Sequence, residues 1–258
     1  MKVGLVLSGG GARGIAHLGV IQALIENNIK IDIISGTSAG SIIGALYSYG
    51  YSPNEILEIT EDTNVVRLLR PALSFTGLIK MDGLGQLLLK YMPEGSFEAL
   101  KIPLIISATN INAGKPKYFD SGDLIAPIMA SSCIPIIFNH ITIDGVDYVD
   151  GGITDNFPID PIRKESDLVI GSHTNFIAGD FNDFNMKSLL ERTMLIAISG
   201  NVYPKKEQCD LFIDPPKLGN YNGFDIRRSK QIYSEGYEFT CSLLEKNPDL
   251  LGQLVSTR

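Results

Sequence analysis

The chain has 258 residues, of which 44% are hydrophobic and 20% are charged, and this is enough to bury a large core. We expect one globular domain over residues 1–258, since the sequence shows no repeat and no low-complexity segment. The net charge of -7 argues against a nucleic-acid partner and against electrostatic adhesion to anionic membranes, because both need clustered basic residues. Any contact with lipid would therefore be mainly hydrophobic.

Cysteine and apolar patterns restrict the protein further. Cys133, Cys209 and Cys241 are odd in number and widely spaced, so we expect reduced thiols in a cytoplasmic protein, at most peripheral at the inner membrane surface. No carboxylate loop or histidine cluster has metal-ligand spacing, so neither a metal nor another cofactor is expected. The apolar run at residues 3–7 is too short for a signal peptide, and no run of about 18 apolar residues predicts a membrane span.

The first part of the chain alternates strand and helix patterns. Short apolar runs with the length of buried strands occur at residues 3–7, 31–34, 104–108 and 168–170. Helical patterns at residues 17–26 and 42–49 separate the first of these runs. This alternation predicts a mostly parallel sheet that is covered by helices on both faces.

The region 65–92 is rich in leucine, with scattered basic residues, prolines and glycines, and it predicts short helices with joints. Two arrangements fit this composition. One is a mobile apolar flap over a lipid-binding groove, which would make transient contact with a membrane surface. The other is ordinary helical cover on the sheet, which is the commoner arrangement.

The later part of the chain contains one strong hairpin signal. Residues 141–143 and 146–149 flank Asp144-Gly145, which predicts a two-residue turn and one antiparallel hairpin that ends at Asp150. Beyond it, the sequence predicts a helix at residues 187–199, a strand at 210–213 and a long helical segment at 226–244.

A G-x-S-x-G turn, Gly36-Thr37-Ser38-Ala39-Gly40, joins the second strand pattern to the second helix pattern. A sharp turn between strand and helix exposes the serine hydroxyl, and the glycines at positions 36 and 40 leave room for the bend. Ser38 is therefore a candidate nucleophile for acyl chemistry. The five residues alone are a weak signal, because a Gly-Ser loop that caps a helix fits them equally well.

A glycine loop follows the first strand, and Gly9, Gly11 and Gly14 match the dinucleotide-binding pattern G-x-G-x-x-G. A dinucleotide site also needs an acidic residue at the end of the second strand to bind the ribose. Asp32 has about the right spacing but stands at the start of that strand. The dinucleotide interpretation thus lacks its ribose partner and leaves the serine turn unexplained.

The same loop suits a different use. Amides of Gly9, Gly10 and Gly11 at a helix N-terminus can stabilise a developing oxyanion as readily as a phosphate. If the two strands are adjacent and parallel, this loop and Ser38 lie side by side at the carboxyl edge of the sheet. Arg13 would add positive charge there, or it would point to solvent or to a nearby carboxylate.

The base that would activate Ser38 is not obvious, because the chain has three histidines and none clearly fits. His17 lies in the first helix pattern, where packing or solvent exposure is ordinary. His173 follows a strand pattern and is the better-placed rival. His140 pairs with Val149 if the hairpin has the register set by its turn, and it would then project away from Asp150.

Asp150 is the alternative base. It closes the hairpin and precedes Gly151-Gly152, which let the backbone turn sharply and leave the carboxylate uncrowded. An aspartate before glycine commonly forms an Asx turn. If Asp150 approaches Ser38, its partial burial raises its pKa and makes it able to accept the serine proton directly, as a Ser-Asp dyad.

The three motifs in this order resemble the patatin-like phospholipase family, in particular its short bacterial members. Residues 9–14 resemble the oxyanion loop of the family, Ser38 its nucleophile and Asp150 its dyad base. The stretches 130–135 and 156–158 are similar to further family segments, in which residues such as Ser131, Ser132 and Asn156 more often hold structure than do chemistry. The resemblance is strongest over residues 1–173.

Membership of this family implies a three-layer α/β/α fold and hydrolysis of acyl esters, usually lipids, without calcium or another cofactor. We therefore expect a serine lipid acyl hydrolase that works through an acyl-enzyme on Ser38. A lipid acyltransferase with the same dyad and, from a different class, a dinucleotide-binding module built on residues 9–14 are the alternatives. A lipid-binding protein that has lost catalysis fits less well, because every part of the dyad is present.

Overall fold

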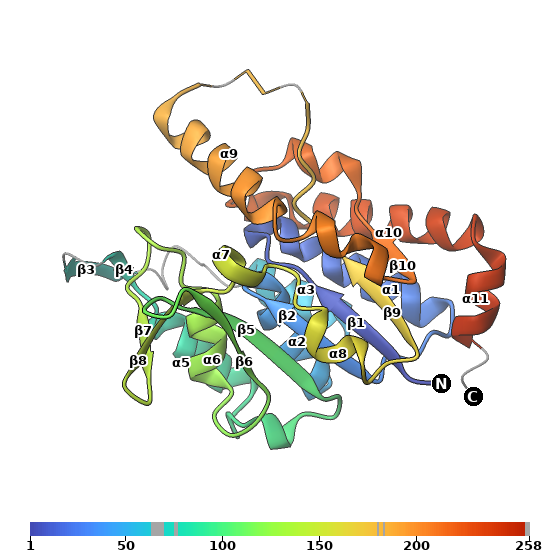
Figure 1. Ribbon diagram of the computed structural model, residues 1–258, viewed down its shortest axis with the longest axis horizontal. Helices are drawn as coiled ribbons and strands as arrows, with labels where there is room; N and C mark the ends of the chain where they lie inside the picture. Colours follow the sequence, from blue (N-terminus) through green and yellow to red (C-terminus); the bar gives the residue numbers. More distant parts are fainter. Residues whose placement is uncertain (63–69, 75–76, 180, 183, 256–258) are drawn as a thin grey trace.

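The structure is a computed structural model that describes residues 1–62, 70–74, 77–179, 181–182 and 184–255 (Figure 1). Within these residues, the central sheet has eight strands. They lie in the order β10 (Leu211–Ile213), β9 (Leu168–Ser172), β1 (Val3–Leu7), β2 (Ile33–Thr37), β5 (Leu104–Asn110), β8 (Val146–Asp150) and β7 (Ile141–Ile143), and β6 (Lys115–Phe119) pairs with β5 outside this order. The strands from β10 to β5 run parallel, and β6, β7 and β8 are antiparallel to their neighbours.

Helices cover both faces of this sheet. The α-helices among the described residues are α1 (Ala16–Glu26), α2 (Ala39–Tyr49), α3 (Pro53–Asp62), α5 (Asp82–Tyr91), α6 (Ile125–Ser131), α7 (Gly152–Asp155), α8 (Asp160–Arg163), α9 (Met186–Ser199), α10 (Ser229–Glu245) and α11 (Pro248–Val255). Short 3-10 helices are η1 (Gly11–Ile15), η2 (Phe97–Ala99), η3 (Tyr203–Gln208), η4 (Pro216–Asn220) and η5 (Ile226–Arg228).

Strand β1 shows why two helical layers form. Its residues are all buried, and its side chains alternate between the two faces of the sheet. Leu5 and Leu7 belong to the large core cluster that α1, α2 and α10 complete, whereas Val6 packs with Phe157 and Ile162 in a smaller cluster at α8. A strand that is apolar on both faces needs cover on both faces. The expected three-layer α/β/α fold with a mostly parallel sheet is confirmed.

Strand β5 brings two distant segments together. Along one edge β5 pairs with β6, so its other partners share the opposite edge. On that edge Ser107 lies opposite Thr37 of β2, and the next residue, Ala108, lies opposite Asp150 of β8. The ends of β2 and β8 therefore meet, which places the residue after Thr37 beside Asp150.

The Leu-rich region 65–92 differs from the predicted short helices. Residues 63–69, 75 and 76 lie outside the described residues, but β3 (Arg70–Ser74) and β4 (Gly77–Lys80) form an antiparallel hairpin. The prediction of helix is therefore wrong for this stretch. Among the described residues of this region only α5 is helical, and it covers the core with the buried Leu88.

Other predicted elements are found near their expected positions. The hairpin β7–β8 has the predicted register, with Ile143 opposite Val146. A second antiparallel hairpin of the central sheet, β5–β6, was not predicted. The segment 226–244 divides into η5 and α10. All three cysteines are free, and no helix in the described ranges is long and apolar enough to cross a membrane.

Candidate active site

Ser38 stands at a strained turn between β2 and α2. Its φ of 51° and ψ of -122° are unusual for a residue with a side chain, and such a conformation costs about 1–3 kcal/mol. Three hydrogen bonds hold it. The Ser38 N–H donates to Ser131 Oγ (2.8 Å), Ser131 Oγ donates to Ser107 O (2.7 Å), and Ser41 Oγ donates to Ser38 O (2.7 Å). The backbone around the serine is thus fixed before any substrate binds.

The two glycines of the G-x-S-x-G turn are needed for close backbone approach. A Cβ atom on Gly36 would lie 2.7 Å from the carbonyl group of Gly40, and one on Gly40 would lie 2.3 Å from Leu7 O. Because Leu7 ends β1, this approach brings the glycine loop after β1 against the Ser38 turn. The predicted adjacency of the two turns is found.

The Asp150 carboxyl lies near the Ser38 hydroxyl, which lowers the pKa of that carboxyl. Its carboxylate also accepts the Gly152 N–H (2.8 Å), and its own N–H donates to Cys133 O (2.9 Å). The residue is only 8% exposed. Burial raises the pKa of Asp150 to about 6, against the hydrogen bond from Gly152 and the nearby Ser38 hydroxyl, which lower it. A carboxylate with this pKa is ionised at neutral pH and is still basic enough to accept a proton.

The glycine loop after β1 presents two free amides beside Ser38. The Gly9 N–H donates to Asn156, to Oδ1 (3.1 Å) and to the backbone oxygen (3.3 Å), so it is not available to a ligand. Neither Gly10 nor Gly11 has a partner for its N–H among the described residues. Gly11 has a φ of 55°, which favours glycine. Of the three predicted oxyanion amides, those of Gly10 and Gly11 thus remain available.

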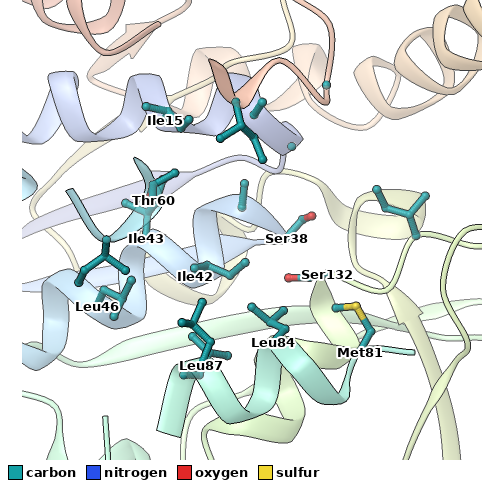
Figure 2. Close-up of a pocket in the computed structure, with 18 of the residues that line it drawn as sticks. Ile15, Ser38, Ile42, Ile43, Leu46, Thr60, Met81, Leu84, Leu87 and Ser132 are labelled. Atoms are coloured by element: carbon teal, nitrogen blue, oxygen red, sulfur yellow. The ribbon is translucent and has the colours of Figure 1, made fainter. Parts of the chain in front are cut away.

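A deep apolar cavity of about 280 Å³ opens at Ser38 (Figure 2). Its walls come from α2, α3, α5 and the loops around residues 134 and 224, and the described lining residues include no charged side chain. The apolar lining includes Ile42, Ile43, Leu46, Ile59, Leu84, Leu87, Leu88, Ile134, Phe138 and Phe224. A cavity of this kind accepts a long apolar group whose polar end lies at the serine.

A model described as patatin-like phospholipase matches residues 5–163, more than half of the chain, and this stretch includes Ser38 and Asp150. The chain belongs to the patatin-like phospholipase family. The predicted resemblance is thereby confirmed.

Relatives of this patatin-like chain are longer than it is. An uncharacterized NTE family protein of Mycobacterium tuberculosis is 36% identical over 178 residues, which cover 67% of this chain and 49% of the relative. Lysophospholipase NTE1 of Kluyveromyces lactis is 30% identical over 293 residues, which cover 98% of this chain and 20% of the yeast protein. The chain thus spans about half the length of the first relative and about a fifth of the second.

A solved structure shares the fold of this patatin-like chain. VipD from Legionella pneumophila superposes with a TM-score of 0.64 at 16% sequence identity, over 95% of this chain and 67% of VipD. The likeness supports the three-layer fold.

None of the three histidines reaches Ser38. The imidazole of His173 is fully buried, with Nδ1 3.0 Å from Asp214 Oδ1, and its ring stacks on Phe212 and meets Tyr203 edge-on. His173 follows β9, two strand positions from β2, which is about 10 Å away across the sheet. The better-placed rival of Asp150 is thus engaged elsewhere.

The other two histidines have structural surroundings. His17 is buried, with Nε2 2.8 Å from Ser8 O and Nδ1 2.7 Å from Ser172 Oγ. Because a carbonyl only accepts, Nε2 carries the hydrogen and Nδ1 accepts from Ser172. Burial lowers the pKa of His17 to about 4, which keeps it neutral. His140 lies on the hairpin surface, 3.5 Å from Asp147, and projects away from Asp150 as the register predicts.

Arg13 points to a nearby carboxylate, that of Glu191, which was one of the positions expected for it. Its buried side chain donates from Nε to Tyr221 O (2.6 Å) and lies 3.4 Å from Glu191 Oε1. The guanidinium thus holds the C-terminal part of the chain against the glycine loop. Its predicted role as an added charge at the oxyanion has no support in these contacts.

Ser132 is a site residue whose role the sequence did not predict. Ser131 and Asn156 hold backbone, as expected, by binding the amides of Ser38 and Gly9. Ser132 instead lines the cavity, and its buried Oγ has no partner within the described part of the chain. Figure 2 shows it facing the cavity close to Ser38. A hydroxyl left unpaired in an apolar wall is available to a polar atom of a bound substrate.

Proposed function

We propose that this protein is a serine acyl hydrolase that cleaves acyl esters of lipids with Ser38 as nucleophile and Asp150 as base. The observation that carries the proposal is the position of Ser38 beside the buried Asp150 carboxylate, where β2 and β8 end, at the mouth of an uncharged cavity. The named lysophospholipase relative supports the same chemistry.

The dyad supplies every proton transfer that ester hydrolysis needs. Asp150 accepts the hydroxyl proton as Ser38 Oγ attacks the carbonyl carbon, and it returns that proton to the alcohol that leaves. Water then attacks the acyl-enzyme while Asp150 again takes and returns a proton, which releases the acid and regenerates Ser38. The amides of Gly10 and Gly11 stabilise the oxyanion in both steps, a contribution of about 3 kcal/mol for each donor.

The cavity selects the acyl group. Its wall follows α2 from Ser38 to Leu46, a rise of about 12 Å. An extended alkyl chain advances roughly 1.25 Å per carbon, so about nine or ten carbons fit along this wall. Each buried methylene contributes about 0.8 kcal/mol. In this proposal, α5 from the Leu-rich region helps to hold the acyl chain, because Leu84, Leu87 and Leu88 line the cavity.

Fluorophosphonate labelling tests the nucleophile, because the reagent reacts with activated serines. We expect one label on the wild-type protein, located on Ser38 by peptide mass spectrometry, and no label on Ser38→Ala. Ser132→Ala is the matched control, since it removes the other serine hydroxyl near the cavity mouth, and it should still be labelled. A label on Ser132, or stabilisation by a dinucleotide without any serine reactivity, would overturn the proposal.

A further inference from the structure

Helix α9 has an apolar face that points outward. Met186 is 88% exposed and Ile196 is 53% exposed, and Leu189 and Leu190 between them are each nearly half exposed. With Thr193 and Ala197, these residues fall within an arc of about 120° of the helix surface. Thr193 Oγ1 donates to Leu189 O (3.0 Å), so even this hydroxyl is satisfied within the helix. We call Met186, Leu189, Leu190 and Ile196 the α9 face.

Glu191 and Arg192 of α9 point the other way. Glu191 Oε1 accepts the Gly223 N–H (2.8 Å) and pairs with Arg13, and Arg192 donates to Ala178 O (2.6 Å). Surface helices normally bury their apolar side and expose their charges. Here polar contacts to the body of the protein fix the opposite orientation. A contiguous apolar surface held outward in this way is typical of an interaction site.

The side of α9 opposite to this face, and the residue Asn201 just after the helix, contact the surroundings of the active site. Glu191 binds Gly223, which lines the cavity together with Phe224, and Phe224 is itself 53% exposed. At the other end of the helix, Asn201 donates to Gly152 O (3.0 Å), two residues after Asp150. Figure 1 shows α9 at the periphery of the molecule, next to α7. Helix α9 is therefore held against a loop that lines the cavity and against the turn after Asp150.

We propose that the α9 face docks on the surface of a lipid aggregate, so that an acyl chain passes into the cavity without crossing water. The inference rests on the proposed function, because it is an acyl chain that needs this route. The described side chains of the face carry no charge, and the protein has a net charge of -7. A zwitterionic or neutral lipid surface therefore fits better than an anionic one.

Vesicle flotation tests the docking surface. The full chain carrying Ser38→Ala is floated with phosphatidylcholine vesicles, with and without Leu189→Glu/Ile196→Glu. Each glutamate substitution removes one side chain from the lipid and should lower the partition coefficient roughly tenfold, so the two together should lower it roughly a hundredfold. Ile25→Glu, at the 41% exposed end of α1, is the matched control and should bind like its parent.

Turnover of a water-soluble short-chain ester separates the two proposals. With Ser38 intact, the glutamate pair should hydrolyse this ester at the wild-type rate and lose activity on vesicles. If the wild type cleaves no ester but its flotation depends on the α9 face, the proposed function fails and the docking surface stands. Flotation that is unchanged by the glutamate pair would overturn the docking surface. The docking surface would also be overturned if light scattering showed a dimer without lipid and the two glutamate substitutions converted it to a monomer. The α9 face would then join two copies of this chain.

Discussion

Two buried pairs of polar side chains lie at the carboxyl edge of the same sheet, and they differ in what surrounds them. Ser38 and Asp150 meet where β2 and β8 end, and the apolar cavity opens beside them. His173 and Asp214 meet beyond β9 and β10, where Phe212 and Tyr203 close off the imidazole. A histidine beside an aspartate is a familiar catalytic arrangement, yet here it has no route to a substrate. Access, rather than residue type, distinguishes the two pairs.

Backbone conformation distinguishes them as well. Ser38 is held at a positive φ, whereas no positive φ occurs at His173. Strain of this kind persists only where neighbouring contacts impose it, and it is concentrated at functional sites. The contacts through Ser131 and Ser41 impose it at Ser38.

Among the variants of the two pairs and their surroundings, removal of the proposed nucleophile Ser38 should lower activity most. We expect Ser38→Ala to lower kcat/KM for a lipid ester by at least about 10⁴-fold, because no acyl-enzyme can form. The thermal midpoint should stay close to that of the wild type, since Ser38 Oγ is not among the groups that hold the turn. Initial rates and a melting curve check both statements, and residual turnover above one per cent would contradict them.

A change in the proposed oxyanion loop should lower activity less than the loss of Ser38 does. We expect Gly11→Ala to lower kcat about 10²- to 10³-fold, because a Cβ there would lie 2.4 Å from Gly223 O and would displace the amide. Gly114→Ala is the matched control, since Gly114 also has a positive φ (62°) but nothing within 4 Å of the added Cβ. Steady-state rates of both variants separate loss of the amide from backbone strain. Equal rates would count against the role of Gly11.

The pH profile should report Asp150. Because the proposed mechanism uses this carboxylate as the base, and its pKa is about 6, kcat/KM should fall about tenfold per pH unit below pH 6. Protonation is favoured in the folded protein, so this group stabilises the fold below its unfolded pKa near 4, and that stability is lost as pH rises through 6. Rate and denaturation measurements from pH 4 to 8 check both trends. A rate that stays constant from pH 7 to pH 4 would contradict the role proposed for Asp150.

Changing the enclosed pair should barely affect catalysis. We expect His173→Ala to keep kcat/KM within about threefold of the wild type, while the free energy of unfolding falls by about 1–3 kcal/mol because Asp214 loses its buried partner. Ester hydrolysis and denaturant unfolding measure the two quantities. A loss of turnover in a stable protein would reverse the roles assigned to the two pairs.

Features encoded in neighbouring residues were predictable from the sequence. The apolar run of β1, the Asp144-Gly145 turn and the G-x-S-x-G turn each carry a local pattern, and their elements lie where that pattern places them. The position of Asp150 beside Ser38 followed from motif order and is explained by the shared edge of β5.

Features that depend on distant contacts were not predictable. The Gly9 N–H donates to Asn156, which lies 147 residues later in the sequence, and no pattern near either residue indicates this bond. Apolar residues of α2 and α5, such as Ile42 and Leu84, have the same helical spacing whether they face a packed core or a cavity. Apolar residues occur all round α9, and only the contacts of Glu191 and Arg192 show which of them point outward.

Asp150→Asn tests the central claim most directly, because asparagine keeps an oxygen that accepts the Gly152 N–H and loses the base. We expect kcat/KM to fall about 10³- to 10⁴-fold, while stability at pH 7 is unchanged or higher by up to about 3 kcal/mol, because no buried charge remains. Turnover and unfolding measured on one preparation give both values. Near wild-type turnover in a folded Asp150→Asn protein would contradict the Ser38-Asp150 dyad.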